Sequence, residues 1–345
     1  MLEIDGSQKS GSGTILRLSL AFASILGESL HIFNIRHRRA QRGLCPQHLE
    51  SVYTAAKLCN AEIGGASLGS SELWFKPSSI MKGEFRAEIG TAGSIPMLLL
   101  TVLPICAYAK GDVSIHVVNG GTDVRFAPTI NYLNYVLLPV LERMGLEASL
   151  TIKRFGYYPK GMGEVVLHVC NKSKLTSLRI ENFGEIEEVG GVSVCTFLEK
   201  QRVAERQVES AKDAFKNRGY NPNIRVVNDK SNPHQKGSSI VLWAKTNKGA
   251  VLGGDAIGEL RKSSETVGRE AAKNLLKETE AKATVDVHLA DMLVPYIALA
   301  KGESTYLTRT MTDHLDTNIW LVDKILDTKI QTSKVGNLIK VEKLK

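Results

Sequence analysis

The sequence has few cysteines, and their spacing does not indicate a cysteine-based site. Among its 345 residues there are five cysteines, and no two of them form a Cys-x-x-Cys pair. An odd number of widely separated cysteines indicates neither a disulfide framework nor a zinc site. We therefore expect free thiols in a reducing compartment. The cysteines are Cys45, Cys59, Cys106, Cys170 and Cys195.

Targeting features are also missing from the sequence. The first residues lack the basic and apolar regions of a secretory signal peptide. The longest apolar run, residues 95–109, is too short for a membrane-spanning helix and contains Pro104. Together with the cysteine pattern, these absences lead us to expect a cytoplasmic protein with no membrane partner.

The composition is that of a globular protein with a positive charge. Hydrophobic residues make up 43% of the chain and charged residues 23%, which is ordinary for a folded domain. The length allows two or three domains with a substantial core. The net charge of +8 favours polyanionic partners such as nucleic acids, although it would equally serve solubility.

One order of predicted elements occurs three times along the chain. Each unit reads as a loop, a helix, a strand, a second loop, a second helix and two strands. The units cover about residues 1–83, 84–180 and 281–345. We expect a mixed α/β (α+β) fold in which these units form one large domain, arranged about a pseudo-threefold axis.

Residues 184–279 interrupt this order and predict a smaller inserted α/β domain. The large domain would then comprise residues 1–183 and 280–345. None of the candidate phosphate-binding residues lies in the insertion. We therefore expect the insertion to be peripheral to any reaction centre.

Loops at equivalent places in the three units carry the residues that could bind or react. The first unit has four arginines within Arg36–Arg42, directly after a predicted strand. Guanidinium groups match phosphate geometry, although a solvated charge patch would also fit. The second unit has the loop 119–125, and the third has His314. If the units pack about one axis, these loops converge.

His314 lies between a predicted strand, 306–310, and a predicted helix, 315–326. An imidazole is partly uncharged at neutral pH and can act as a nucleophile. A single histidine at a helix start is also commonly a surface residue. The Gly-rich loop 5–14 can present amides to an anion or can be a plain turn, and no Gly-Lys-Ser/Thr follows it, so it is not a P-loop.

Short motifs distributed over all three units, and scarce in the insertion, match one known family. The matching motifs are Asp5-Gly6-Ser7-Gln8, Gly11, Gly13, Ile15-Leu16-Arg17, Ile35-Arg36, Arg39-Ala40, Gly43-Leu44, Gln47-His48-Leu49, Gly90, Ala92-Gly93-Ser94, Thr101-Val102-Leu103-Pro104, Gly120-Gly121-Thr122-Asp123, Gly156-Tyr157-Tyr158-Pro159, Gly161, Gly163, Leu289-Ala290-Asp291, His314-Leu315 and Thr317-Asn318. In this set the chain resembles the RNA 3′-terminal phosphate cyclase family.

The resemblance implies a fold and an activity. The fold would have three repeats, each with two helices on a four-stranded sheet, and a smaller insertion of thioredoxin-like elements. The activity would be the ATP-dependent conversion of an RNA 3′-phosphate to a 2′,3′-cyclic phosphate, by a ligase-class nucleotidyl-transfer enzyme. The partners would be RNA with a 3′-terminal phosphate, ATP and a divalent metal ion (Mg²⁺ or Mn²⁺), with no obligate protein partner.

The resemblance also implies residue roles. His314 falls on the position of the family's nucleophile. The residues that fall on ATP- or phosphate-binding positions are Arg17, Arg36, Arg39, Gln47, Pro128, His288, Leu289, Ala290, Asp291 and Met292.

The chain departs from the family pattern at four places. Ser10 replaces a glutamate on the metal and phosphate side, Leu100 and Met292 replace glutamines, and His288 replaces an aromatic residue. The metal ligands are therefore left open. Two other functions remain to be compared: a non-catalytic cyclase-like protein of ribosomal RNA maturation, against which His314 argues, and an enolpyruvyl-transferase-like enzyme, against which the insertion argues.

Overall fold

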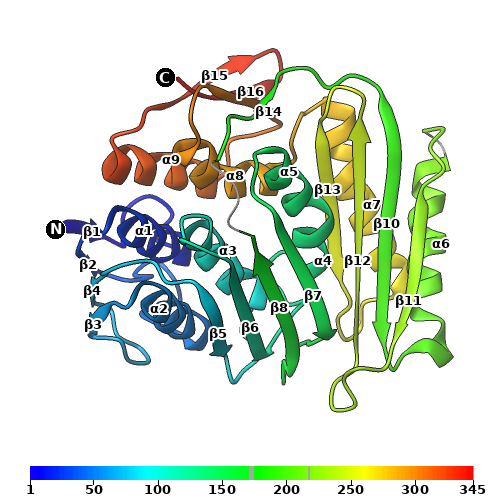
Figure 1. Cartoon of the computed structure of the whole chain (residues 1–345). Helices are drawn as coiled ribbons and strands as arrows, with labels where there is room; N and C mark the ends of the chain where they lie inside the picture. Colours follow the sequence, from blue (N-terminus) through cyan, green and yellow to red (C-terminus); the bar gives the residue numbers. More distant parts are fainter. Residues whose placement is uncertain (171–174, 217, 345) are drawn as a thin grey trace.

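The computed structural model describes residues 1–170, 175–216 and 218–344 and has a mixed α/β fold. Within these residues, the strands form four four-stranded sheets (Figure 1). Three of the sheets share one topology. In each, the first two strands are parallel, the fourth strand is antiparallel to the second, and the third strand lies at the edge.

The first unit has a helix start that its sequence encodes directly. The Ser12 side chain caps helix α1 by accepting a hydrogen bond from the Thr14 amide. The helix ends at Gly27, whose φ of 69° lies in the left-handed region that glycine adopts without strain. The elements of this unit are β1 (Leu2–Asp5), α1 (Gly13–Leu26), β2 (Leu30–Phe33), α2 (Pro46–Cys59), β3 (Glu62–Gly64) and β4 (Leu73–Lys76).

The second unit repeats this order with one change in its second helix. The predicted helix over 130–144 is continuous, but it contains a π-helical stretch, Leu133–Leu137, between α4 and α5. The elements are β5 (Gly83–Glu88), α3 (Ile95–Cys106), β6 (Val113–Gly120), α4 (Ile130–Tyr132), α5 (Leu138–Arg143), β7 (Ala148–Arg154) and β8 (Gly163–Val169).

The third unit begins before the insertion, not after it. Strand β9 (Arg179–Ile180) pairs parallel with β14 and completes the third sheet. This differs from the boundary expected at residue 180, because a two-residue strand is too short to show any periodicity in the sequence. The remaining elements are α8 (Val287–Leu299), β14 (Ser304–Thr308), α9 (Asp313–Leu326), β15 (Ile330–Val335) and β16 (Leu338–Lys343).

The insertion forms the fourth sheet, with strand order β11-β10-β12-β13. Helices α6 and α7 cover one face of this sheet. The other face packs on the second unit, where Trp243 stacks on Tyr135 with ring centroids 4.7 Å apart. The elements are β10 (Ile186–Thr196), a 3₁₀ turn (Glu199–Gln201), α6 (Val203–Lys216), β11 (Asn223–Asp229), β12 (Gly237–Thr246), β13 (Val251–Ile257) and α7 (Ser264–Ala281).

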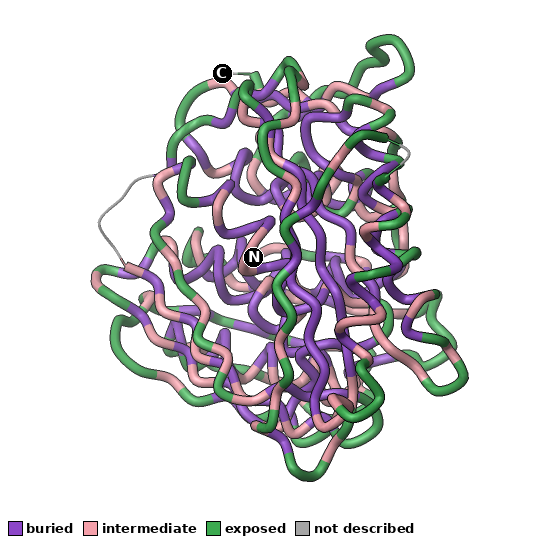
Figure 2. Tube along the Cα trace, turned by 90° about the vertical axis from the view of Figure 1, so that its right-hand side faces the viewer, coloured by how far each residue is buried: buried purple, intermediate pink, exposed green. Residues whose placement is uncertain are grey.

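One hydrophobic core connects all three units and the inner face of the insertion. Helix α1 contacts α2, α3 and α9, and α8 contacts α3 and α9, so the helices of different units pack on one another. Figure 2 shows buried segments through the middle of the molecule and exposed loops around it. None of the helices in the described part of the chain is both long and apolar enough to cross a membrane. All five cysteines are free thiols, as expected.

A close approach between α6 and α7 gives a test of the insertion's packing. A Cβ atom added at Gly268 would collide with the Gln207 carbonyl oxygen, which belongs to the backbone of α6 and cannot rotate away. We expect Gly268→Ala to lower the free energy of unfolding by about 1–3 kcal/mol, as overpacking usually does. Urea denaturation followed by circular dichroism measures this change.

Gly64→Ala is the matched control, because its added Cβ would lie 3.6 Å from Trp74, an ordinary contact. Its unfolding free energy should change by no more than about 0.5 kcal/mol. Equal stability of Gly268→Ala and the unmodified protein would show that α6 and α7 do not pack this closely.

Candidate active site

His314 lies in the first turn of α9, where hydrogen bonds to the capping residue fix the backbone. Thr312 is the N-cap, and its Oγ1 accepts a hydrogen bond from the Leu315 amide at 2.9 Å. The same hydroxyl donates to Asp291 Oδ1 of α8 at 2.6 Å. The imidazole is half-buried. The start of α9 is therefore held against α8, with the His314 ring at the edge of the protein interior.

The first Gly-rich loop and helix α1 hold the other side of this turn. Thr14 Oγ1 donates to Asn318 Oδ1 at 3.0 Å, and Asn318 Nδ2 donates to the Asp291 carbonyl oxygen at 2.8 Å. The Ser10 amide donates to Thr317 Oγ1 at 3.1 Å. The loop 5–14 thus lies beside His314, although the two segments are at opposite ends of the sequence.

Three arginines from the first unit form what we call the arginine cluster (Arg17, Arg36 and Arg39), and Arg17 and Arg39 lie close enough to His314 to act on its charge. The pKa of His314 is lowered to about 4, first by burial and then by the charges of Arg17 and Arg39. The pKa of Arg17 is itself lowered to about 10 by burial and by the charges of Arg36 and Arg39. The imidazole is therefore neutral at physiological pH and faces a region of concentrated positive charge.

His48 is a member of this site that sequence reasoning did not assign to it. It is buried in the first turn of α2, with Nδ1 2.7 Å from Cys45 Sγ. Burial, and after it the charges of Arg17 and Arg36, lower the pKa of His48 to about 3. Gly13 has to be glycine here, because an added Cβ would collide with His48 Nε2. His48 was visible only as part of a matching motif, since nothing in its spacing predicts burial against an arginine.

Gln47 and Arg36, two other residues predicted to bind ATP or phosphate, form hydrogen bonds to the protein backbone. Gln47 Oε1 accepts from the amide of Ser94, the N-cap of α3, at 2.7 Å, and so joins the start of α2 to the loop 90–94 that precedes α3. An Arg36 terminal nitrogen donates to the Gly43 carbonyl oxygen at 2.9 Å across the arginine loop. Arg39 is exposed, so of these two arginines it is the freer one to meet a ligand.

Residues 288–292, which were predicted to contact the nucleotide, lie on different faces of helix α8. Leu289 and Ala290 are fully buried in the hydrophobic core, so their side chains cannot contact a nucleotide. His288 is exposed, Asp291 is half-buried and Met292 is partly buried. Burial raises the pKa of Asp291 to about 7, against the effect of its hydrogen bond from Thr312.

The insertion reaches this region, which differs from the expectation that it is peripheral. The half-buried Pro128 precedes Thr129, whose amide donates to Asp255 Oδ2 of β13 at 2.8 Å. Burial raises the pKa of Asp255, and the charge of His288 acts in the opposite direction. Asp255 therefore lies within electrostatic range of His288. Strand β13 was not predicted from the sequence, because Gly253-Gly254, which lies within it, reads as a turn signal.

The loop 119–125 faces the insertion. Asp123 in this loop is buried, and its Oδ1 accepts from the Ile130 amide at 3.2 Å. Burial raises the pKa of Asp123 to about 7, a Ser239 hydrogen bond from the insertion opposes this shift, and the charge of Asp255 adds to it. The arginine loop and His314 come together, whereas the loop 119–125 of the second unit lies at the interface with the insertion.

The residues around His314 do not form a ready-made metal site. Among the described residues, no three His, Cys, Asp or Glu side chains near His314 are close enough together to hold a metal ion. The three that are, Asp112, His168 and Cys170, lie elsewhere in the molecule. The Ser10 hydroxyl pairs with Ser12 Oγ at 2.9 Å, so this position supplies no carboxylate.

The family model and the curated relatives agree with each other. A family model described as RNA 3′-terminal phosphate cyclase matches residues 8–332. A protein of Pyrobaculum aerophilum named RNA 3′-terminal phosphate cyclase is 41% identical, over 99% of this chain and 97% of its own length. A protein of the same name from Pyrobaculum neutrophilum is 42% identical, over 97% of this chain and 96% of its own length. Another from Methanosarcina mazei is 40% identical, over 99% of each chain.

The electrostatics of His314 can be tested by titration. Its ring protons should shift with a midpoint near pH 4 in nuclear magnetic resonance spectra. Arg17→Met should raise this midpoint because it removes a positive charge, and Asp313→Asn should lower it because Asp313 raises the pKa. A midpoint near the ordinary 6.5 would contradict the burial of His314 beside the arginine cluster.

The same shift predicts a direction for stability. An unfolded chain protonates His314 near its ordinary pKa of 6.5, whereas the folded chain protonates it near 4. The unfolded state therefore binds more protons between these values, so the His314 contribution to the free energy of unfolding is lost as pH falls through this window. His314→Ala should show a correspondingly weaker fall in its urea midpoint over the same range.

Proposed function

Because this chain belongs to the RNA 3′-terminal phosphate cyclase family, we propose that it converts RNA 3′-terminal phosphates to 2′,3′-cyclic phosphates with ATP, through a covalent bond between His314 and AMP. One observation supports this mechanism above the others. A half-buried, uncharged imidazole stands beside Arg17 and Arg39, and Arg36 lies close to Arg17, so that a nucleophile and a binding site for phosphate charge occur together.

In the first step, a ring nitrogen of His314 attacks the α-phosphorus of ATP. The nitrogen–phosphorus bond forms while the bond from that phosphorus to the bridging oxygen breaks, and pyrophosphate leaves. The lowered pKa of His314 keeps the attacking lone pair free at neutral pH. Arginine side chains in a partly desolvated site hold the phosphate oxygens and stabilise their developing charge.

In the second step, an oxygen of the RNA 3′-phosphate attacks the phosphorus bound to His314. The imidazole leaves, and the RNA end becomes a diphosphate-linked adenylate. In the third step, the neighbouring 2′-hydroxyl loses its proton and attacks the RNA phosphorus, and AMP leaves as the ring closes. Because the hydroxyl and the phosphate belong to one ribose, this closure is unimolecular and mainly requires alignment.

The family implies a divalent metal ion, but the described residues near His314 form no three-ligand site for it. We therefore derive no step from the metal. The residues that we assign to phosphate contact are Arg17, Arg36 and Arg39, and those that we assign to the nucleotide are Gln47, Pro128, His288, Asp291 and Met292. Leu289 and Ala290 would support the nucleotide segment from the core.

A non-catalytic role in ribosomal RNA maturation is the alternative within the same family. Such a role would need neither a nucleophile nor a lowered histidine pKa. The half-buried His314, whose pKa is lowered to about 4 by burial and by the charges of Arg17 and Arg39, supports the catalytic role.

Incubation with ATP and Mg²⁺ should add one AMP to the protein, and the added mass should be absent from His314→Ala. The bond should be labile in acid and stable in alkali, as expected for a phosphoramidate. Intact-mass spectrometry measures the adduct. His37→Ala is the matched control, since His37 is an exposed histidine of the arginine loop. An adduct that persists in His314→Ala would contradict the assignment.

Arg39→Ala should lower kcat/KM for RNA with a 3′-phosphate by about 10- to 100-fold, which is the loss of one charge-assisted hydrogen bond. Its melting temperature should stay unchanged, because Arg39 is exposed. Arg36→Ala should lower both kcat/KM and the melting temperature, because Arg36 also donates a hydrogen bond to the Gly43 carbonyl oxygen.

The matched control is Arg42→Ala, an exposed arginine of the same loop that does not contribute to the shifts of His314 or Arg17. It should retain nearly full turnover. Equal losses in Arg39→Ala and Arg42→Ala would show that the loop acts only through its total charge.

A further inference from the structure

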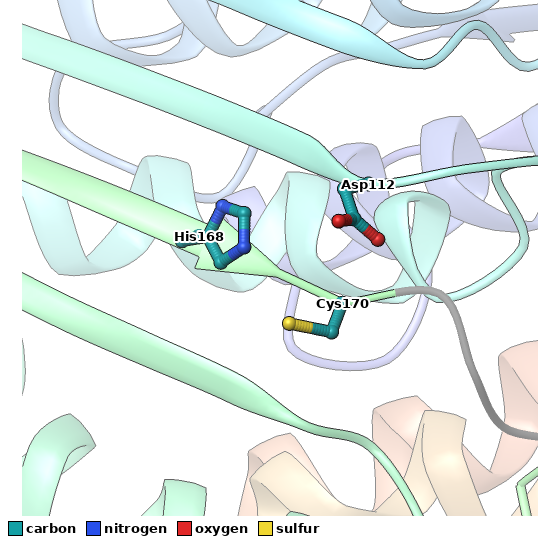
Figure 3. A group of neighbouring side chains, drawn as sticks. All are labelled: Asp112, His168 and Cys170. Carbon is teal, nitrogen blue, oxygen red and sulfur yellow. The ribbon is translucent and has the colours of Figure 1, made fainter.

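Three side chains with metal-ligand atoms come together at one end of the second sheet. They are Asp112, His168 and Cys170, whose ligand atoms all lie within 4.8 Å of one another. Figure 3 shows His168 and Cys170 at the end of one strand, with the Asp112 side chain beside them at the start of the neighbouring strand. The group lies at the start of β6. The loop 119–125 lies at the opposite end of this strand, so the group and the loop are about 25 Å apart, the length of a strand of this size.

Strand register explains this meeting. Strands β6 and β8 are antiparallel, with Val113 opposite Val169 and Ser114 opposite His168. Asp112, one residue before β6, and Cys170, one residue after β8, are therefore opposite each other. Side chains two residues apart share a face, so His168 and Cys170 lie on the face that also carries Asp112.

The surrounding hydrogen bonds hold all three residues in place. His168 Nδ1 lies 3.0 Å from Ser114 Oγ, which leaves Nε2 for a ligand. The Cys170 amide donates to the Glu147 carbonyl oxygen at 2.9 Å, and the Asp112 carbonyl oxygen accepts from the Gly83 amide at 2.9 Å. A hydrogen bond to the second ring nitrogen is the usual means of orienting a metal-binding histidine.

We propose that Asp112, His168 and Cys170 form a zinc-binding site, with Nε2, Sγ and one carboxylate oxygen as ligands and a water molecule in the fourth position. Zinc accepts this combination of nitrogen, sulfur and oxygen. Tetrahedral bond lengths place neighbouring ligand atoms about 3.3–3.6 Å apart, so small side-chain rotations complete the site. His168 and Cys170 are half-buried, and Asp112 is exposed toward the solvent that supplies the water.

Binding would be coupled to folding and to pH. The Cys170 thiol gives up its proton when its sulfur bonds the metal, so uptake of the metal releases a proton. The ligands come from two strands that are distant in sequence, so the site exists only in the folded chain, and the metal would stabilise that state. The absence of a Cys-x-x-Cys pair explains why the sequence did not indicate zinc: the spacing is set across strands, not along the chain.

Cobalt provides the test, because a thiolate bound to Co²⁺ gives a near-ultraviolet charge-transfer absorption. The metal-free full-length protein, kept reduced with a non-thiol reductant, should bind one Co²⁺ with this absorption, and Zn²⁺ should displace it. Cys170→Ser should lose the absorption. His168→Ala and Asp112→Asn should raise the dissociation constant for Zn²⁺ at least about tenfold.

Two matched controls separate this site from others. His116→Ala removes a histidine of the same sheet face, which bonds Glu164, and Cys45→Ser removes a thiol that contacts His48 at the candidate active site. Both should bind metal as the unmodified protein does, and all variants should melt at similar temperatures without metal. Cobalt binding without the thiolate absorption, or unchanged zinc affinity in both Cys170→Ser and His168→Ala, would overturn the proposal.

Discussion

The concentration of positive charge around Arg17 is the constraint on which the candidate site depends. Burial and the charges of Arg36 and Arg39 all disfavour the charged form of Arg17, and the opposing influence is the Cys45 thiol, not a carboxylate. Holding like charges together in a partly desolvated region raises the free energy of the empty site. If the cluster binds a polyphosphate, as we propose, the ligand would relieve this repulsion, and the fold would store part of its affinity in the arrangement of these guanidinium groups.

The repeated topology explains how distant segments meet. In each unit a loop joins the second strand to the second helix, and these loops carry the arginine cluster's Arg36 and Arg39 in the first unit and Thr312 in the third. Packing of α1 against α9 brings the two loops together. In the second unit the equivalent loop bonds the insertion through Asp255. The first and third units therefore supply the residues that we assign to the reaction, while the second unit anchors the insertion.

The parts of the structure that sequence predicted are those encoded locally. The helix over 315–326 was predicted, and His314 was recognisable because it lies where that helix begins; in the structure Thr312 is the N-cap of this helix. What sequence missed depends on tertiary contacts. Strand β9 exists only because β14 is beside it, and the burial of His48 depends on the close approach of Gly13. Leu289 and Ala290 matched the family's nucleotide segment, yet the helical period turns them into the core.

The arginine cluster and the nucleophile are coupled in a way that suits nucleotidyl transfer. Burial, and after it the charges of Arg17 and Arg39, lower the pKa of His314, so in the proposed mechanism the empty site would keep its nucleophile unprotonated without a general base. An anionic substrate bound there would compensate the arginines and raise the pKa of His314 part of the way from about 4 toward its ordinary value of 6.5, while the effect of burial would remain. The ring would therefore still be largely neutral near pH 7 at the moment of attack. If the pKa of this histidine were ordinary in the empty site, the same anion would raise that pKa above about 7. The ring would then lose its lone pair to a proton at the moment of attack.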